Sequence, residues 1–168
     1  ALHNHLLEHQ PGVLAQLYSG YYSSIRPPDS GQQEISSERL PVFFRQNDQI
    51  YSTYLPEPIR RAEEAGLAVL SEAERGALDV FDREAQRDEL VVAIDATPGD
   101  ALFLNNRTVL HSRTHYDDHE APEDRRHLLR VWMHMRDWAP MPPHAYHYTL
   151  AKDRDEKIFL PDSIGIGL

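Results

Sequence analysis

The hydrophobic pattern of this chain changes its period near Asp88, and no other sequence feature constrains the fold as strongly. Before this point apolar residues recur three and four positions apart, which is the spacing of an amphipathic helix. After it, short apolar runs alternate with turn residues, which is typical of antiparallel strands. The 168 residues are enough for one hydrophobic core, so we expect a single domain over residues 1–168 with helices in its first half and a mainly β second half.

Helix signals define four segments in the first half. Residues 2–18 have helical spacing that is interrupted at Pro11-Gly12, which predicts two short helices. A third helix is predicted over residues 56–65. A fourth begins at Ser71, because Ser71 and Glu74 have the spacing of a capping box, in which each side chain accepts a hydrogen bond from the other residue's backbone N–H.

The other predicted elements are strands. Residues 41–45 and 49–54 form a predicted hairpin across Asn47-Asp48, and a turn-rich surface loop over residues 21–33 precedes it. In the second half, the strand-like runs are residues 90–94, 101–104, 108–116 and 127–135.

Composition excludes several classes of function. The chain has no cysteine, so any metal must be held by His, Asp or Glu, and a reducing, cytoplasmic location is expected. Its formal charge of −10 and its pI near 5.4 argue against nucleic acid and anionic membrane surfaces as partners. No apolar run is long enough to cross a bilayer. The chain begins at Ala1 without an initiator Met, inside a predicted helix, so we expect a portion of a longer protein.

The last predicted strand places two arginines on one face. Side chains two residues apart on a strand point the same way, so this face carries Arg126, Leu128, Arg130 and Trp132. Two guanidinium groups beside Leu and Trp suit a bound carboxylate or another anion, because the planar fork binds a carboxylate through two hydrogen bonds. An exposed sheet face with ordinary surface arginines explains the spacing equally well, so both interpretations stay open.

A longer motif surrounds these arginines. It comprises Gly99-Asp100, Asn105-Asn106, Leu110-His111-Ser112-Arg113 and Arg126-His127-Leu128-Leu129-Arg130-Val131-Trp132. A lone His on a strand is more often structural than a ligand. As a whole, however, residues 99–135 resemble the C-terminal motif block of the TauD/TfdA family of iron(II)- and 2-oxoglutarate-dependent dioxygenases. Residues 2–18 and 40–66 are also similar to this family, so the resemblance covers nearly the whole chain.

The resemblance implies roles for three residues. His111 would be the distal iron ligand, and Arg126 would hold the distal carboxylate of 2-oxoglutarate, which makes both of them catalytic residues. Arg130 would lie beside Arg126 at the cosubstrate, or near an anionic group of the substrate.

The resemblance also implies a fold and an activity. The fold is a double-stranded β-helix, or jelly roll, with flanking α-helices, of which this chain is the C-terminal portion. The activity is oxidative decarboxylation of 2-oxoglutarate coupled to hydroxylation, or a related C–H oxidation, of a small organic substrate by O₂ at a mononuclear non-haem iron(II). Association into a homo-oligomer would fit the family.

The iron ligand set is incomplete in this sequence. The family's facial triad needs two His and a carboxylate, and no H-x-D or H-x-E motif precedes His111. We therefore expect the chain to lack two of the three ligands. We expect His111 and Arg126 to point into a common cavity that has no three-ligand iron centre.

Two alternatives come from other functional classes. One is a non-catalytic jelly-roll module whose Arg126 and Arg130 only bind an anionic small ligand. The other is a zinc-binding interaction domain built on His3, His5 and His9, since two His at i and i+4 on a helix can chelate a metal. Succinate release separates the first alternative from a dioxygenase, and a metal titration of a His5→Ala variant tests the second.

Overall fold

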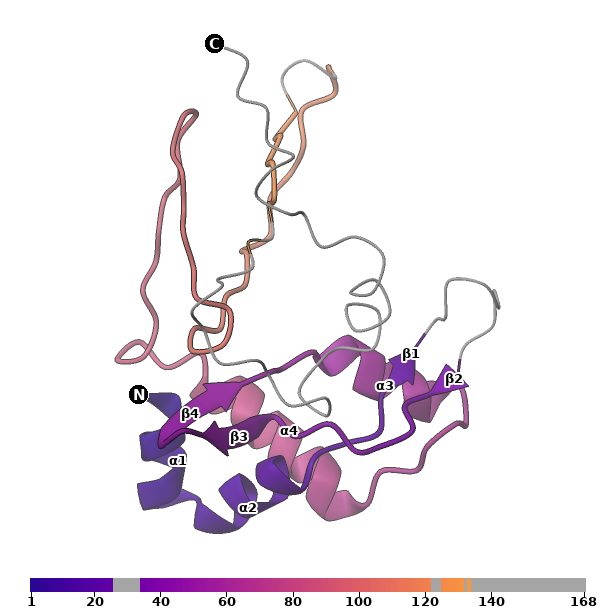
Figure 1. The fold of residues 1–168 in the computed structure, drawn as a ribbon. Helices are drawn as coiled ribbons and strands as arrows, with labels where there is room; N and C mark the ends of the chain where they lie inside the picture. The colour runs from indigo at the N-terminus through magenta and orange to yellow at the C-terminus, as the bar shows by residue number, and fades with distance from the viewer. Residues whose placement is uncertain (26–33, 122–124, 132, 134–168) are drawn as a thin grey trace, which may run out of the picture.

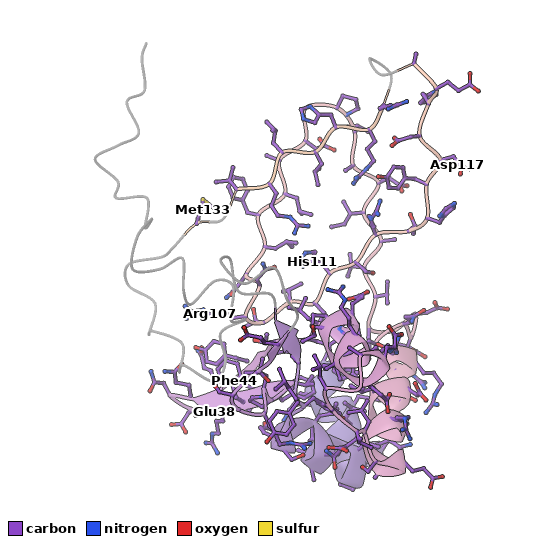
Figure 2. All side chains as sticks on the ribbon, turned by 90° about the vertical axis from the view of Figure 1, so that its right-hand side faces the viewer. Glu38, Phe44, Arg107, His111, Asp117 and Met133 are labelled. Atoms are coloured by element: carbon purple, nitrogen blue, oxygen red, sulfur yellow. The ribbon has the colours of Figure 1, made fainter. Side chains whose placement is uncertain are left out.

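The computed structural model describes residues 1–25, 34–121, 125–131 and 133. These residues form two regions of different character (Figure 1, Figure 2). The helical body comprises residues 1–25 and 34–90, where four helices and two small two-stranded sheets pack together. The extended arms comprise the described residues from 91 to 133, which rise away from the body as two long loops. The first arm is residues 91–104, the second arm is the described residues from 108 to 133, and a turn at residues 105–107 separates them.

The first two helices separate where the sequence predicts. α1 spans Leu2–His9 and α2 spans Pro11–Ser19, so Gln10 lies between them. Pro11 occupies the first turn of α2, where an N–H would have no partner within the helix. The buried residues of the two helices are Leu6, Leu14 and Leu17.

Two antiparallel strand pairs lie beside the helices. β3 (Phe43–Gln46) and β4 (Gln49–Ser52) form the predicted hairpin. Asn47 and Asp48 have φ angles of 49° and 61°, the left-handed conformation that a two-residue turn of this kind needs and that Asn and Asp tolerate.

A second strand pair lies in and after the region predicted as a loop. β1 (Ser24–Ile25) and β2 (Glu34–Ile35) pair in antiparallel register and flank the undescribed residues 26–33. Strands of two residues are too short to produce an alternating pattern, so the sequence predicted only the turn-rich loop.

The last two helices begin where the sequence predicts. α3 spans Pro56–Glu64, and α4 spans Glu72–Glu84 with Ser71 as its N-cap. The hydroxyl of Ser71 accepts from the backbone N–H of Glu74 at 3.2 Å, and the Glu74 carboxylate accepts from the backbone N–H of Ser71 at 2.7 Å. Burial raises the pKa of Glu74, but hydrogen bonds from Arg39 and Ser71 outweigh it, so this pKa lies below its ordinary value.

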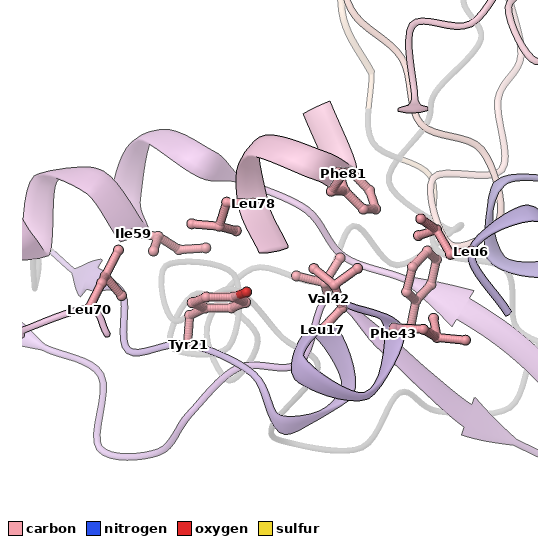
Figure 3. Close-up of a cluster of buried hydrophobic side chains, with 10 residues drawn as sticks. Leu6, Leu17, Tyr21, Val42, Phe43, Ile59, Leu70, Leu78 and Phe81 are labelled. Carbon is pink, nitrogen blue, oxygen red and sulfur yellow. The ribbon is translucent and has the colours of Figure 1, made fainter. Parts of the chain in front are cut away.

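The helical body has its own hydrophobic core (Figure 3). All four helices and the β3–β4 hairpin contribute side chains to this core. The fully buried Phe81 of α4 contacts the rings of Phe43 and Tyr54 at centroid distances of 5.7 and 4.2 Å. The cluster of buried side chains consists of Leu6, Leu14, Leu17, Tyr21, Val42, Phe43, Ile59, Leu70, Leu78 and Phe81. All of these residues precede the extended arms.

The strands predicted after residue 89 do not form among the described residues. No strand is assigned to the described parts of residues 90–94, 101–104, 108–116 and 127–135. Large apolar side chains in these runs are exposed, with Val92 at 84%, Phe103 at 75% and Leu129 at 82%. A strand needs a neighbour for its backbone groups and a layer against its apolar face, and the described residues supply neither to the arms. The mainly β architecture is therefore not confirmed by this part of the chain.

Every helix among the described residues is too short or too polar to cross a bilayer.

Candidate functional site

The motif block at residues 99–133 lies on the extended arms, and its first element is a turn. Gly99 has a φ of 98°, a conformation that glycine adopts without strain. The carboxylate of Asp100 accepts hydrogen bonds from the backbone N–H of Thr97 at 2.8 Å and from its hydroxyl at 3.0 Å. These bonds, the backbone one first, hold the pKa of Asp100 below its ordinary value. Asp100 therefore stabilises the turn as a carboxylate.

The second element is a turn centred on Asn105. The side-chain carbonyl of Asn105 accepts from the backbone N–H of Arg107 at 3.0 Å, and its backbone carbonyl accepts from the N–H groups of Thr108 and Val109 at 3.0 Å each. The carbonyl of Arg107 in turn accepts from the backbone N–H of Ser52 in β4 at 2.8 Å. The turn that leads to His111 is therefore attached to the hairpin of the helical body.

His111 lies two residues after Val109, the last residue whose backbone N–H bonds to this turn, on extended chain above the helices (Figure 2). Its side chain is exposed. His115 is also exposed, and its Nε2 lies 3.4 Å from a carboxylate oxygen of Asp117. Within the described ranges, no group of three or more His, Asp or Glu side chains is placed to hold a metal ion. Among the described residues, the His111 imidazole is therefore a candidate ligand without two further ligands placed beside it.

Arg126 is placed by its backbone and by an aromatic ring. Its backbone N–H donates to the carboxylate of Asp118 at 3.1 Å. Its guanidinium carbon lies over the ring of Tyr116, 5.0 Å from the centroid, and that of Arg113 lies over the same ring at 4.7 Å. Two guanidinium groups therefore meet at one aromatic side chain, five residues after His111.

His111, Arg126 and Arg130 all belong to the second arm, and all three side chains are exposed. The contacts of Tyr116 bring Arg126 close to the chain segment that carries His111. A cavity shared by His111 and Arg126 stays a prediction. Trp132, the fourth residue of the predicted arginine face, lies outside the described residues.

The three histidines of α1 have separate partners in the helical body. His3 Nε2 lies 2.9 Å from the hydroxyl of Tyr18, and His5 Nε2 lies 2.9 Å from a carboxylate oxygen of Glu84. His9 Nδ1 lies 3.0 Å from the backbone carbonyl of His5. The rings of His5 and His9 stack at 4.5 Å, but His3 faces Tyr18 instead, so the three imidazoles are not brought together as a zinc site.

The residues that surround Arg126 in the structure were not predicted from the sequence. Tyr116, Arg113 and Asp118 lie inside the motif block, yet none of them has a spacing that predicts a contact with a residue eight or more positions away. The only signal was compositional, namely an aromatic residue among closely spaced charged residues.

The comparisons with known proteins cover both the helical body and most of the motif block. The chain matches the family described as taurine catabolism dioxygenase TauD, TfdA family over residues 1–132. It is similar to the FR-33289 synthase of Streptomyces rubellomurinus, at 30% identity over 150 residues that cover 84% of this chain and 42% of the synthase. It is also similar to a taurine hydroxylase-like protein of Stachybotrys chartarum, at 30% identity over 169 residues that cover 96% of this chain and 40% of that protein.

The chain thus spans about two fifths of the length of these curated relatives. The family match includes both His111 and Arg126, and it confirms the resemblance that the sequence motifs indicated. The chain belongs to the TauD/TfdA family of taurine catabolism dioxygenases.

Proposed function

We propose that the full-length protein couples the oxidative decarboxylation of 2-oxoglutarate to the hydroxylation, or a related C–H oxidation, of a small organic substrate. In the balanced reaction, 2-oxoglutarate, O₂ and the substrate C–H group yield succinate, CO₂ and the hydroxylated product. The observation that carries this proposal is the family match over residues 1–132, which includes the complete segment from Gly99 to Val131. The name of one relative, a taurine hydroxylase-like protein, agrees with oxidation of a small molecule.

Arg126 is proposed to bind the distal carboxylate of 2-oxoglutarate. A guanidinium group keeps its charge at any physiological pH and presents paired N–H groups that match the two oxygens of a carboxylate. The contact of Arg126 with Tyr116 involves the ring, and the carboxylate of Asp118 accepts from the backbone N–H of Arg126. Arg130, four residues later, is proposed to serve the cosubstrate or an anionic group of the substrate.

His111 is proposed to be an iron ligand. Iron(II) held by two imidazoles and a carboxylate keeps open positions for a cosubstrate and O₂, which is the chemistry that this metal supplies in such sites. The described residues contain no cluster of three suitable side chains, so His111 is proposed as one ligand of the set and not as a complete site. The role of His111 is therefore to present one neutral imidazole nitrogen, and the other ligands are not assigned.

The experiment is succinate formation from 2-oxoglutarate by the full-length protein, with and without added iron(II). A panel of small organic acids and amino-acid-like compounds serves as the source of substrates. His111→Ala should abolish iron-dependent succinate formation, and His115→Ala, on the same exposed segment, should retain it. Equal activity of the two variants would remove His111 from the site.

Succinate formation also separates this proposal from an anion-binding module without catalysis. Such a module would bind 2-oxoglutarate through Arg126 and Arg130 and release no succinate with any substrate of the panel. Iron affinity gives an independent measure, because His111→Ala should weaken it whichever substrate is used.

A further inference from the structure

Tyr116 stands at the centre of the contacts made by the second arm. The guanidinium carbons of Arg113 and Arg126 lie 4.7 and 5.0 Å from the centroid of its ring. The exposed fraction of Tyr116 is 37%, compared with 75% for Phe103 on the first arm. This tyrosine is the aromatic residue around which the two basic side chains collect.

The backbone that carries Arg126 is held by neighbouring residues of the same arm. The carboxylate of Asp118 accepts from the backbone N–H of Arg126 at 3.1 Å. The guanidinium of Arg125 donates to the backbone carbonyls of His119 and Glu120 at 3.2 and 3.1 Å. These contacts hold the backbone at Arg125 and Arg126, and the guanidinium of Arg126 lies over the ring of Tyr116.

A ring orients a guanidinium in a way that a carboxylate does not. A carboxylate partner takes up the N–H groups at the edge of the guanidinium and neutralises its charge. An aromatic ring is attracted to the cation over its face, so the charge is kept and in-plane N–H groups stay available for a bidentate partner. Among the described residues, Asp118 is the acid that hydrogen-bonds to Arg126, and its carboxylate binds the backbone N–H.

Arg113 places a second cation at the same ring. Arg113 and Arg126 carry like charges and share one ring, so each raises the positive potential at the other. A bound dianion relieves this repulsion.

We propose that Tyr116 is a positioning residue, whose ring holds the guanidinium groups of Arg126 and Arg113 in the orientation that receives the distal carboxylate of 2-oxoglutarate. This inference rests on the proposed function. It adds Tyr116 and Arg113 to the residues that determine cosubstrate affinity.

The test measures 2-oxoglutarate binding to the full-length protein by calorimetry, together with the kcat and KM of succinate formation. Tyr116→Leu and Tyr116→Gln remove the ring, and Tyr116→Phe retains it. The variants without the ring should raise the Kd and the KM for 2-oxoglutarate roughly two- to fivefold, the scale of an exposed cation–π contact. Their kcat at saturating 2-oxoglutarate should stay within about twofold of the parent value, and Tyr116→Phe should bind about as tightly as the parent.

Two controls show whether the effect passes through Arg126. Phe103→Leu, on the first arm, should leave the Kd for 2-oxoglutarate unchanged. In an Arg126→Ala background, Tyr116→Leu should cause little further loss, because a positioning residue has no effect once the group it positions is gone.

The outcomes distinguish failure of this inference from failure of the proposed function. If the parent protein binds 2-oxoglutarate and the variants without the ring bind it equally well, Tyr116 has no positioning role although the proposed function stands. A rise in the KM of the oxidised substrate alone would also overturn the inference. If the parent protein neither binds nor consumes 2-oxoglutarate, both proposals fall.

Discussion

The helical body and the extended arms of this chain differ in where their apolar side chains lie. In the body, Phe81, Leu6 and Leu17 are fully buried and belong to one continuous core. In the arms, Val92, Phe103 and Leu129 are at least 75% exposed. Both regions are rich in apolar residues, so composition does not explain the difference.

The difference shows how far each kind of element depends on distant residues. A helix satisfies most of its backbone groups within its own segment, and one apolar stripe is enough to dock it. A strand leaves its backbone N–H and C=O groups to a neighbour, and that neighbour can come from any part of the protein. In this chain the body is built from local elements, and the proposed site residues lie on the arms.

The largest effect is expected from removing a core side chain. Phe81→Ala should lower the free energy of unfolding by about 3–5 kcal/mol, because a fully buried phenylalanine leaves a cavity. Phe103→Ala, on the exposed arm, should change it by less than about 0.5 kcal/mol. Chemical denaturation followed by far-UV circular dichroism measures both. Equal losses would mean that the arms share the stability of the core.

A glycine pair tests the backbone of the body. Gly20 has a φ of 76°, and a Cβ there would lie 2.7 Å from the backbone carbonyl carbon of Leu40. Gly20→Ala should therefore cost roughly 1–3 kcal/mol of unfolding free energy through strain at this close approach. Gly76 lies inside α4 with nothing within 4 Å of an added Cβ, so Gly76→Ala should stabilise the protein by roughly 0.5–1 kcal/mol. Opposite signs in thermal unfolding are the expected result.

A smaller effect is expected at the N-cap of α4. Ser71→Ala removes the hydroxyl that accepts from the backbone N–H of Glu74, which should cost about 1 kcal/mol of unfolding free energy. Ser37→Ala changes an exposed serine and serves as the control. If both substitutions have the same effect in urea denaturation, the capping box does not stabilise this helix.

The smallest expected effect is a pH dependence at Glu84. Hydrogen bonds from His5, and then from Arg83 and Arg87, lower the pKa of Glu84 from its ordinary value near 4.5. Because the folded state binds this proton less readily than the unfolded state, the stabilisation is present above pH 4.5 and is lost as the pH falls below it. Glu84→Gln should flatten this part of the pH–stability profile. An unchanged acid slope would show that the ion pair between α1 and α4 does not affect stability.

Sequence patterns predicted the body well because its signals are local. Pro11 ends one helix and starts the next, and Ser71 with Glu74 marks the start of α4. The two-residue strands β1 and β2 were missed because they are shorter than any periodic signal.

The arms were harder to predict for the opposite reason. The alternation around Leu128 and Arg130 is present in the sequence, but pairing depends on a neighbouring strand that the alternation does not specify. His111 and Arg126 became candidates through a family motif. The contact of Arg126 with Tyr116 was missed, because it depends on a chain reversal without any period.

Amide hydrogen exchange of this chain tests the central division between body and arms most directly. The amides of α2 and α4 should exchange slowly, because they belong to helices that pack on the core. Residues 110–121 should exchange within about tenfold of the rate of an unstructured peptide, because no backbone–backbone hydrogen bond is made by their N–H groups to other described residues. Protection of residues 110–121 equal to that of α4 would contradict this account, since it would show that the segment carrying His111 folds together with the body.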